Sequence, residues 1–184
     1  GKYYENFIND GYVILNQNGK ILSKKSVSDI LIENRLIKDV KNFSLTDAIH
    51  LNDIEPARNK SQFWKIGDLF MSARHLSLVI HYRPSTNKII NLIQGPLSYS
   101  HDIDFISDKQ ISIFNNKSYS HFNNQASVLD KNRNDYMSSV LIYDFHTKMF
   151  TNKFRNQLNK EDFSTETDGL SEILSDGSML VEEQ

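Results

Sequence analysis

The 184-residue sequence contains no cysteine, so disulfide bonds and thiolate metal sites are excluded. This absence fits a cytosolic and a periplasmic protein equally well. Long apolar runs are also missing, because even stretches such as Leu76–Ile80 are only a few residues long. A membrane-spanning helix needs about 20 consecutive apolar residues, so we expect no membrane span.

An excess of charge of one sign is the third absence, since the formal net charge is −2 at pH 7. This balance predicts neither a nucleic-acid partner nor electrostatic binding to an anionic membrane. Aromatic residues, in contrast, are plentiful, with 11 Phe and 8 Tyr. Such a composition argues against disorder, and the length allows one sizeable core. We therefore expect a single domain over residues 1–184, of unknown oligomeric state.

Alternation of apolar and polar residues is the dominant pattern, and it is typical of β-strands. The first pair of such segments is joined by Asn18 and Gly19, which a type I′ hairpin turn favours. Predicted hairpins cover residues 12–26, 77–94, 139–154 and 170–183. Only Val27–Val40 favours a helix, with Ser26 or Ser28 as its N-cap. Residues 116–136 and 155–169 lack a period and are predicted to be loops.

A unit of four strands recurs along the chain. A strand starting at His50 is followed by one over Gly67–His75 and by the hairpin over residues 77–94, and the same order begins again at His101. A third copy begins at Leu170 and has two strands, and the hairpin over residues 12–26 corresponds to the last two strands of an earlier copy. Repeated four-stranded units are typical of propeller blades.

The sequence therefore predicts an all-β protein, a β-propeller of four-stranded antiparallel blades with one short connecting helix. By this interpretation the chain holds two full blades and two half blades. Propellers usually close with about four to eight blades. We therefore expect residues 1–184 to be one incomplete β-propeller domain.

Polar residues keep register between the copies. Acids occupy the same place in three successive first strands: Asp53, Asp104 and Glu172. His50 and His101 also align, and the third copy has Gly169 at that place. Because first strands line the central channel of a propeller, we expect both histidines to face the same opening. The acids are interpreted mainly as structural, holding backbone or neighbouring-blade groups, although Asp53 or Asp104 could instead orient an imidazole.

Five segments of this sequence resemble the arylsulfotransferase family, in a resemblance that covers roughly Tyr12 to Glu183. They are DAIHLNDIEP (Asp47–Pro56), GDLFMSARHLS (Gly67–Ser77), QGP (Gln94–Pro96), SHDIDF (Ser100–Phe105) and ISIFNN (Ile111–Asn116). Their order, His-x-Asn-Asp, then Ser-x-Arg-His, then Gly-Pro and His-Asp, is fairly specific, because generic propellers do not carry it.

The resemblance implies a six-bladed propeller with its site at the central channel and a periplasmic or secreted location. It implies transfer of a sulfuryl group from an aryl sulfate to a phenol through a sulfated histidine, with no nucleotide sulfate donor and no other cofactor. His101 matches the histidine that takes the sulfuryl group, and His50 is a second catalytic residue. Arg74 and Asn52 match substrate-binding residues. A further family histidine belongs to an earlier blade, which this sequence does not include.

These residue types suit the chemistry. Sulfuryl transfer needs an in-line nucleophile and donors for the non-bridging oxygens. A neutral imidazole such as His101 is a competent nucleophile, and His50 is free to act as general acid and base. Arg74 offers a planar fork of charged donors, and Asn52 adds a neutral one. We expect no metal, because no histidine has metal-ligand spacing on a helix.

Other residues have simpler interpretations. His81, His121 and His146 are predicted to be surface residues, and His75 is predicted to point away from Arg74 by strand alternation. Trp64 is interpreted as a lid over the blade edge or as a stacking surface for an aryl group. Two other functions stay open: a non-catalytic β-propeller that binds a ligand or a protein, and a hydrolase or lyase that uses the same pocket.

Overall fold

The computed structural model describes residues 7–38, 46–116, 138–165 and 167–182. Within these ranges the fold is all-β, with four antiparallel sheets and two short α-helices. The predicted fold class is therefore confirmed. No helix in the described part of the chain has the length and apolar character needed to cross a membrane.

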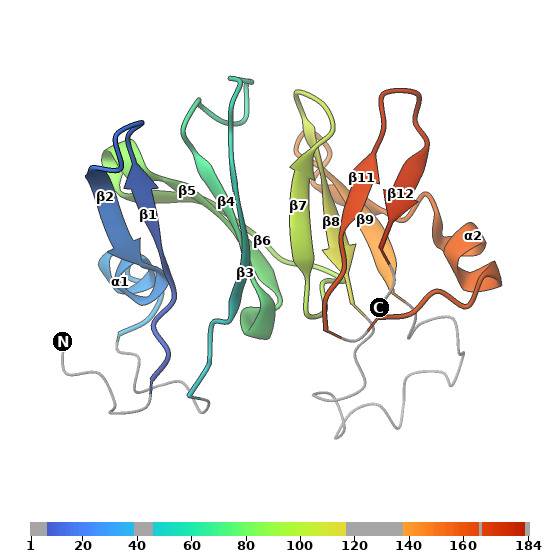
Figure 1. Cartoon of the computed structure of the whole chain (residues 1–184), viewed down its shortest axis with the longest axis horizontal. Coiled ribbons are helices and arrows are strands. Elements are labelled where there is room, and N and C mark those ends of the chain that lie inside the picture. The colour runs from blue at the N-terminus through green and yellow to red at the C-terminus, as the bar shows by residue number, and fades with distance from the viewer. Residues whose placement is uncertain (1–6, 39–45, 117–137, 166, 183–184) are drawn as a thin grey trace.

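The four sheets follow the chain in order and contain two, four, four and two strands (Figure 1). The first contains β1 (Gly11–Leu15) and β2 (Ile21–Ser26). The second contains β3 (Leu51–Pro56), β4 (Leu69–Ala73), β5 (Leu78–Arg83) and β6 (Lys88–Ile93). The third contains β7 (His101–Phe105), β8 (Gln110–Asn115), β9 (Ser139–Asp144) and β10 (Met149–Thr151). The fourth contains β11 (Ser171–Ile173) and β12 (Met179–Val181). This is the predicted sequence of half, full, full and half units.

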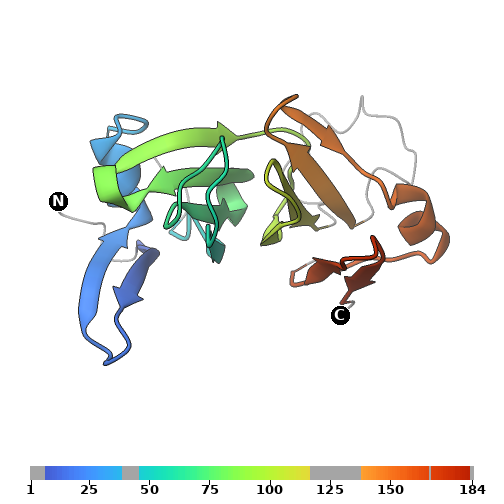
Figure 2. The same cartoon turned by 90° about the horizontal axis from the view of Figure 1, so that it is seen from above.

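The sheets stand side by side along an open arc, with the two-stranded sheets at its two ends (Figure 2). The first strands of successive sheets, β3, β7 and β11, are neighbours on one side of the molecule (Figure 1). Such an arc is compatible with part of a β-propeller, whose closure stays a prediction.

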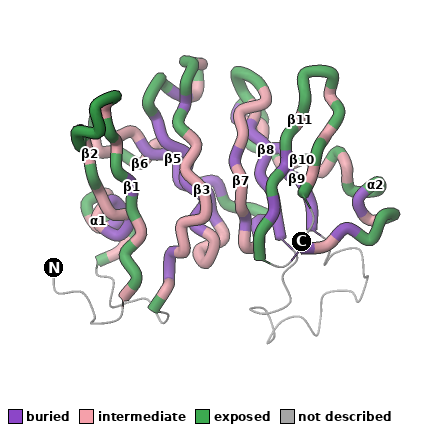
Figure 3. Tube along the Cα trace, viewed as in Figure 1, coloured by how far each residue is buried: buried purple, intermediate pink, exposed green. Residues whose placement is uncertain are grey.

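Buried residues concentrate in the middle strands of the two complete sheets (Figure 3). Every residue of β4 is buried, and so are most residues of β5 and β8, because both faces of these strands are covered. One apolar cluster joins the first two sheets and a second joins the two four-stranded sheets. The core therefore lies between sheets, as in face-to-face packing of β-layers.

Carboxylates tie each sheet to the next one. Each accepts a hydrogen bond from a backbone N–H at or near the start of the following first strand: Asp10 Oδ2 from Leu51 (2.9 Å), Asp53 Oδ2 from Ile103 (2.8 Å) and Asp102 Oδ2 from Ser171 (2.6 Å). The structural interpretation of Asp53 is thus confirmed. Asp104 does not take this role, because Asp102 makes the next link and the buried Asp104 Oδ2 has no hydrogen-bond partner among the described residues.

Helix α1 spans Val27–Glu33, and the Ser26 hydroxyl accepts a hydrogen bond from the Asp29 N–H at 3.1 Å. The predicted cap is therefore confirmed, but the predicted continuation to Val40 is wrong. The helix ends because the backbone turns at Arg35, which has a φ of 60°, and the Leu36 N–H donates to the Leu31 carbonyl oxygen.

A second short helix, α2 (Arg155–Lys160), lies where the sequence predicts only a loop. It forms because Leu158 is buried in the third apolar cluster, with Phe114 and Phe163. Only one of the six residues of α2 is buried, so the sequence shows no helical spacing of apolar residues there. The other predicted loop, residues 116–136, lies outside the described residues from position 117 on.

Two predictions of exposure are wrong. His81 is completely buried, with Nε2 2.9 Å from Asp68 Oδ2 and its ring stacked on Phe70 at 4.3 Å. Alternation misleads at this position because both faces of β5 are covered. Trp64 is 4% exposed and packs edge-on against Phe70, so it belongs to the core and is not a lid. His146 is exposed, as predicted, and His121 lies outside the described residues.

Candidate active site

The starts of β3 and β7 carry irregular backbone that redirects their side chains. The pairing of β3 with β4 shifts between Leu51 and Asp53, and that of β7 with β8 shifts between His101 and Ile103. Each shift leaves one extra residue in the first strand, as in a β-bulge. In β3 the extra residue is Asn52, whose side chain reaches the neighbouring sheet.

Asn52 holds one nitrogen of His101. Its amide nitrogen lies 2.7 Å from His101 Nε2 and 3.2 Å from the Ser100 carbonyl oxygen. Because an NH₂ group can only donate, Nε2 accepts this hydrogen bond and carries the lone pair of the neutral ring. The ring proton then sits on Nδ1.

The surroundings of His101 keep its ring neutral. Burial lowers its pKa to about 4, helped by the positive charge of Arg74 and by His50, whereas Asp168 and a hydrogen bond to the Thr167 backbone act in the opposite direction. At neutral pH the ring is therefore an uncharged base with an available lone pair. Sequence reasoning missed Asp168 and Thr167, since they lie in an irregular segment before β11 with no motif to mark it.

Arg74 directly follows β4, in a 3₁₀ turn over Arg74–Leu76. The guanidinium carbon lies 4.7 Å above the Tyr99 ring, and Nη1 is 3.5 Å from His75 Nε2. Its Nε is buried and has no hydrogen-bond acceptor among the described residues. Buried donors are almost always paired in proteins. A charged donor without an acceptor, beside a neutral histidine, marks a place for an anion.

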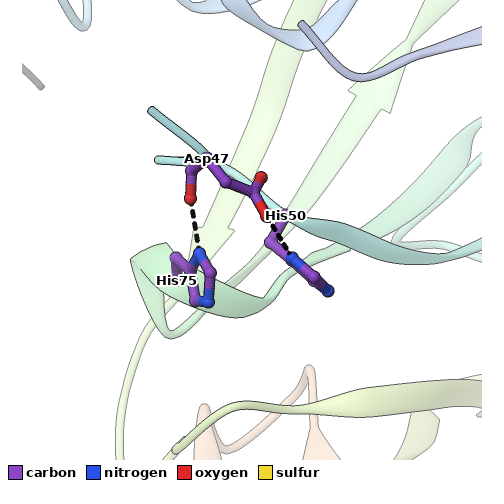
Figure 4. Close-up of side chains that lie close together, drawn as sticks. All are labelled: Asp47, His50 and His75. Atoms are coloured by element: carbon purple, nitrogen blue, oxygen red, sulfur yellow. Dashed lines mark hydrogen bonds and ion pairs between the residues drawn. The ribbon is translucent and has the colours of Figure 1, made fainter. Parts of the chain in front are cut away.

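His50 and His75 are held by one acid (Figure 4). The Asp47 carboxylate lies 2.5 Å from His50 Nδ1, and the Asp47 main-chain oxygen lies 2.5 Å from His75 Nδ1. The two rings are 4.7 Å apart. The predicted orientation of His75 away from Arg74 is wrong, because β4 ends at Ala73 and strand alternation does not extend into the turn.

Asp47, His50 and His75 also form a possible metal-ligand group, with one donor atom of each within 4.8 Å of the others. Both Nδ1 atoms already face Asp47 oxygens. The positive charge of Arg74 next to His75 opposes a bound cation. This arrangement favours a hydrogen-bonded cluster over a metal centre.

A pocket of about 610 Å³ opens at the other end of β3 and β7. Its wall includes acids from three sheets, Glu55, Asp104 and Glu172, and none of the four predicted site residues lines it. Burial raises the pKa of Asp104 to about 7, with further contributions from Asp102 and other nearby carboxylates. Two of the three aligned acids, Asp104 and Glu172, thus line this pocket, and Asp53 does not.

The structure brings together the four residues that the sequence singles out. Asn52 touches His101, and both Arg74 and His50 lie close enough to His101 to lower its pKa. Sequence reasoning missed Asp47 and Tyr99. Asp47 lies in the segment that resembles the family, three residues before His50, and this short spacing is a signal that could have identified it.

The model of the arylsulfotransferase (ASST) family matches residues 2–184. No curated protein and no solved structure matches the chain. The family match spans both four-stranded sheets and all the residues described above, and it supports an arylsulfotransferase-type function in general. The chain belongs to the arylsulfotransferase family.

Proposed function

We propose that this protein transfers a sulfuryl group from an aryl sulfate to a phenol, with His101 as the nucleophile. One observation carries the proposal: the neutral imidazole held by Asn52 lies within the electrostatic reach of Arg74, whose buried Nε has no acceptor in the described part of the chain. A nucleophile next to an unfilled anion site is what transfer from a sulfate monoester requires.

In the first step, the lone pair of His101 Nε2 attacks the sulfur of the aryl sulfate. The bond between sulfur and the aryl oxygen breaks, and its electron pair goes to the oxygen, which takes a proton from His50. The products are a free phenol and sulfated His101. His50 is left neutral and able to accept a proton.

In the second step, an acceptor phenol replaces the first one. It gives its proton to His50 while its oxygen attacks the sulfur, and the bond between sulfur and Nε2 breaks. The electron pair returns to His101. Both histidines are then in their starting states, so the net reaction needs no cofactor.

Arg74 and Asn52 stabilise the negative charge on the sulfuryl oxygens during both steps. The guanidinium supplies fixed donors for the non-bridging oxygens, and its stacking on Tyr99 limits its motion. The Asn52 amide is bonded to Nε2 in the free protein. It is free to donate to a sulfuryl oxygen once Nε2 attacks.

The test is to incubate the full chain with 4-nitrophenyl sulfate and phenol and to measure phenyl sulfate formation. We expect transfer by the wild type, no transfer by His101→Asn, and full transfer by His146→Asn, whose exposed imidazole lies in a turn remote from the site. Mass spectrometry after exposure to the donor alone should find one added SO₃ group on the peptide containing His101. Transfer that survives His101→Asn would contradict the nucleophile assignment.

The unfilled donor of Arg74 is also compatible with a non-catalytic module that binds aryl anions. Saturable binding of aryl sulfates without turnover by the wild type would favour that function. Release of sulfate to water would instead favour a hydrolase. A periplasmic or secreted location is part of the proposal and rests on family membership alone.

A further inference from the structure

We propose that Asp47 is a positioning residue that fixes His50 as the proton donor and acceptor of the transfer. This inference rests on the proposed function. The Asp47 carboxylate oxygen Oδ2 lies 2.5 Å from His50 Nδ1 (Figure 4).

The bond to Asp47 decides which nitrogen of His50 is available. When Nδ1 donates to the carboxylate, only Nε2 can exchange a proton with a phenolic oxygen. The side chains are 37% and 27% exposed, so the pair is open to a substrate.

Backbone strain at His50 supports a positioning role. His50 has a φ of 48°, in the left-handed region that is unfavourable for a non-glycine residue. Such a conformation persists only where surrounding contacts impose it. Here the strained backbone presents the imidazole to Asp47.

The carboxylate has no competing structural task among the described residues. An aspartate in a turn commonly accepts hydrogen bonds from nearby backbone N–H groups. In Asp47, Oδ2 faces the His50 ring, and Oδ1 is buried without a hydrogen-bond partner. The hydrogen bonding of this side chain is therefore committed to the histidine, and its charge also acts on Arg74.

Asp47 also acts through its main chain, which makes the two effects separable. Its carbonyl oxygen is 2.5 Å from His75 Nδ1, and His75 Nε2 is 3.5 Å from Arg74 Nη1. A side-chain substitution at Asp47 removes the contact with His50 and leaves the one with His75. The contact between Arg74 and His75 should therefore survive it, while the loss of the Asp47 charge also reaches Arg74.

The experiment compares wild type with Asp47→Asn on aryl sulfates whose phenols differ in acidity, from 4-nitrophenol to unsubstituted phenol. A poor leaving group needs a proton during bond cleavage, whereas 4-nitrophenolate leaves without one. We expect kcat/KM to fall about 100-fold for phenyl sulfate and far less for 4-nitrophenyl sulfate. The rate should therefore depend more steeply on phenol acidity.

Asp68→Asn is the matched control. It breaks another Asp–His pair, Asp68 with His81, which is buried and remote from the site. We expect a lower melting temperature and the wild-type dependence on phenol acidity. His50→Gln should reproduce the steeper dependence with Asp47 intact, which keeps the test valid if Asp47→Asn folds poorly.

The outcomes separate the two proposals. An inactive wild type, or an active His101→Asn, contradicts the proposed function. If the wild type is active and His101→Asn is not, a steeper dependence on phenol acidity in His50→Gln without one in Asp47→Asn overturns only the role of Asp47. An equal rate loss for all donors in both variants overturns the role of His50 as well.

Discussion

The side chains of Asn52 and His101 meet across two neighbouring sheets, with 2.7 Å between the amide nitrogen and Nε2. Asn52 is the extra residue of an irregular pairing at the start of β3, and His101 is the first residue of β7. The proposed nucleophile and the side chain that contacts it therefore depend on how two sheets pack.

Replacement of Asn52 by alanine should lower kcat about 100-fold, because the orienting donor of Nε2 and a donor for the transferred group are lost together. The measurement is steady-state transfer between 4-nitrophenyl sulfate and phenol. Asn91→Ala is a matched control, since Asn91 is exposed on β6 and its amide contacts His81 at 3.4 Å, outside the site. Equal losses in the two variants would contradict a specific role for Asn52.

His101 should stay unprotonated, and the proposed transfer should stay active, down to low pH. Because the pKa of His101 is lowered to about 4, kcat/KM should show an acidic limb near pH 4 instead of near 6.5. The same shift affects stability. Between these two values the unfolded chain binds more protons at this histidine, so the free energy of unfolding falls as the pH drops from 6.5 to 4.

His101→Asn removes this contribution. Urea unfolding at several pH values should show a smaller loss of stability for the variant than for wild type over that range. The same pH dependence in both proteins would contradict a lowered pKa in the folded state.

Asp104→Asn should stabilise the protein at alkaline pH. The pKa of Asp104 is raised from 3.8 to about 7, so the folded chain binds more protons at this group between these values and its stability falls as the pH rises through them. The side chain of Asp104→Asn does not titrate, so this variant does not lose stability in this way. The difference in stability between the variant and wild type should therefore be larger at pH 8 than at pH 4. Thermal unfolding at both pH values measures it, and an advantage that does not grow with pH would argue against the raised pKa.

Gly169→Ala should destabilise the fold by about 3 kcal/mol, since backbone strain and overpacking add together. Gly169 has a φ of 134°, and a Cβ there would overlap the buried ring of Phe114. Gly19→Ala is the control, because Gly19 has a φ of 77° but open space around it, so that only strain of about 1 kcal/mol applies. Urea unfolding compares the two variants, and equal losses would contradict the overlap.

Gly169 also explains a gap in the sequence repeat. The third copy has glycine where the first two have His50 and His101. Phe114 fills the space that a side chain at this position would need. The sequence revealed the missing histidine, and only the packing revealed why it is missing.

Periodicity predicted the sheets well because strand pairing is local within each hairpin. It could not identify α2, where one buried leucine holds a short helix, or the burial of His81, which depends on what covers β5. Motif order identified His101, Asn52, Arg74 and His50. It could not place His75 or Tyr99, since their roles come from a turn after β4 and from contacts between segments distant in the chain.

The contact between Asn52 and His101 has a consequence for how such a protein can arise. The proposed site is divided between repeat units, because Asn52 belongs to one four-stranded sheet and His101 to the next. These two side chains meet only because the two sheets are neighbours. Duplication of one unit would therefore lengthen the protein without adding a second reaction centre. Divergence between adjacent copies, and not their similarity, would have created the chemistry.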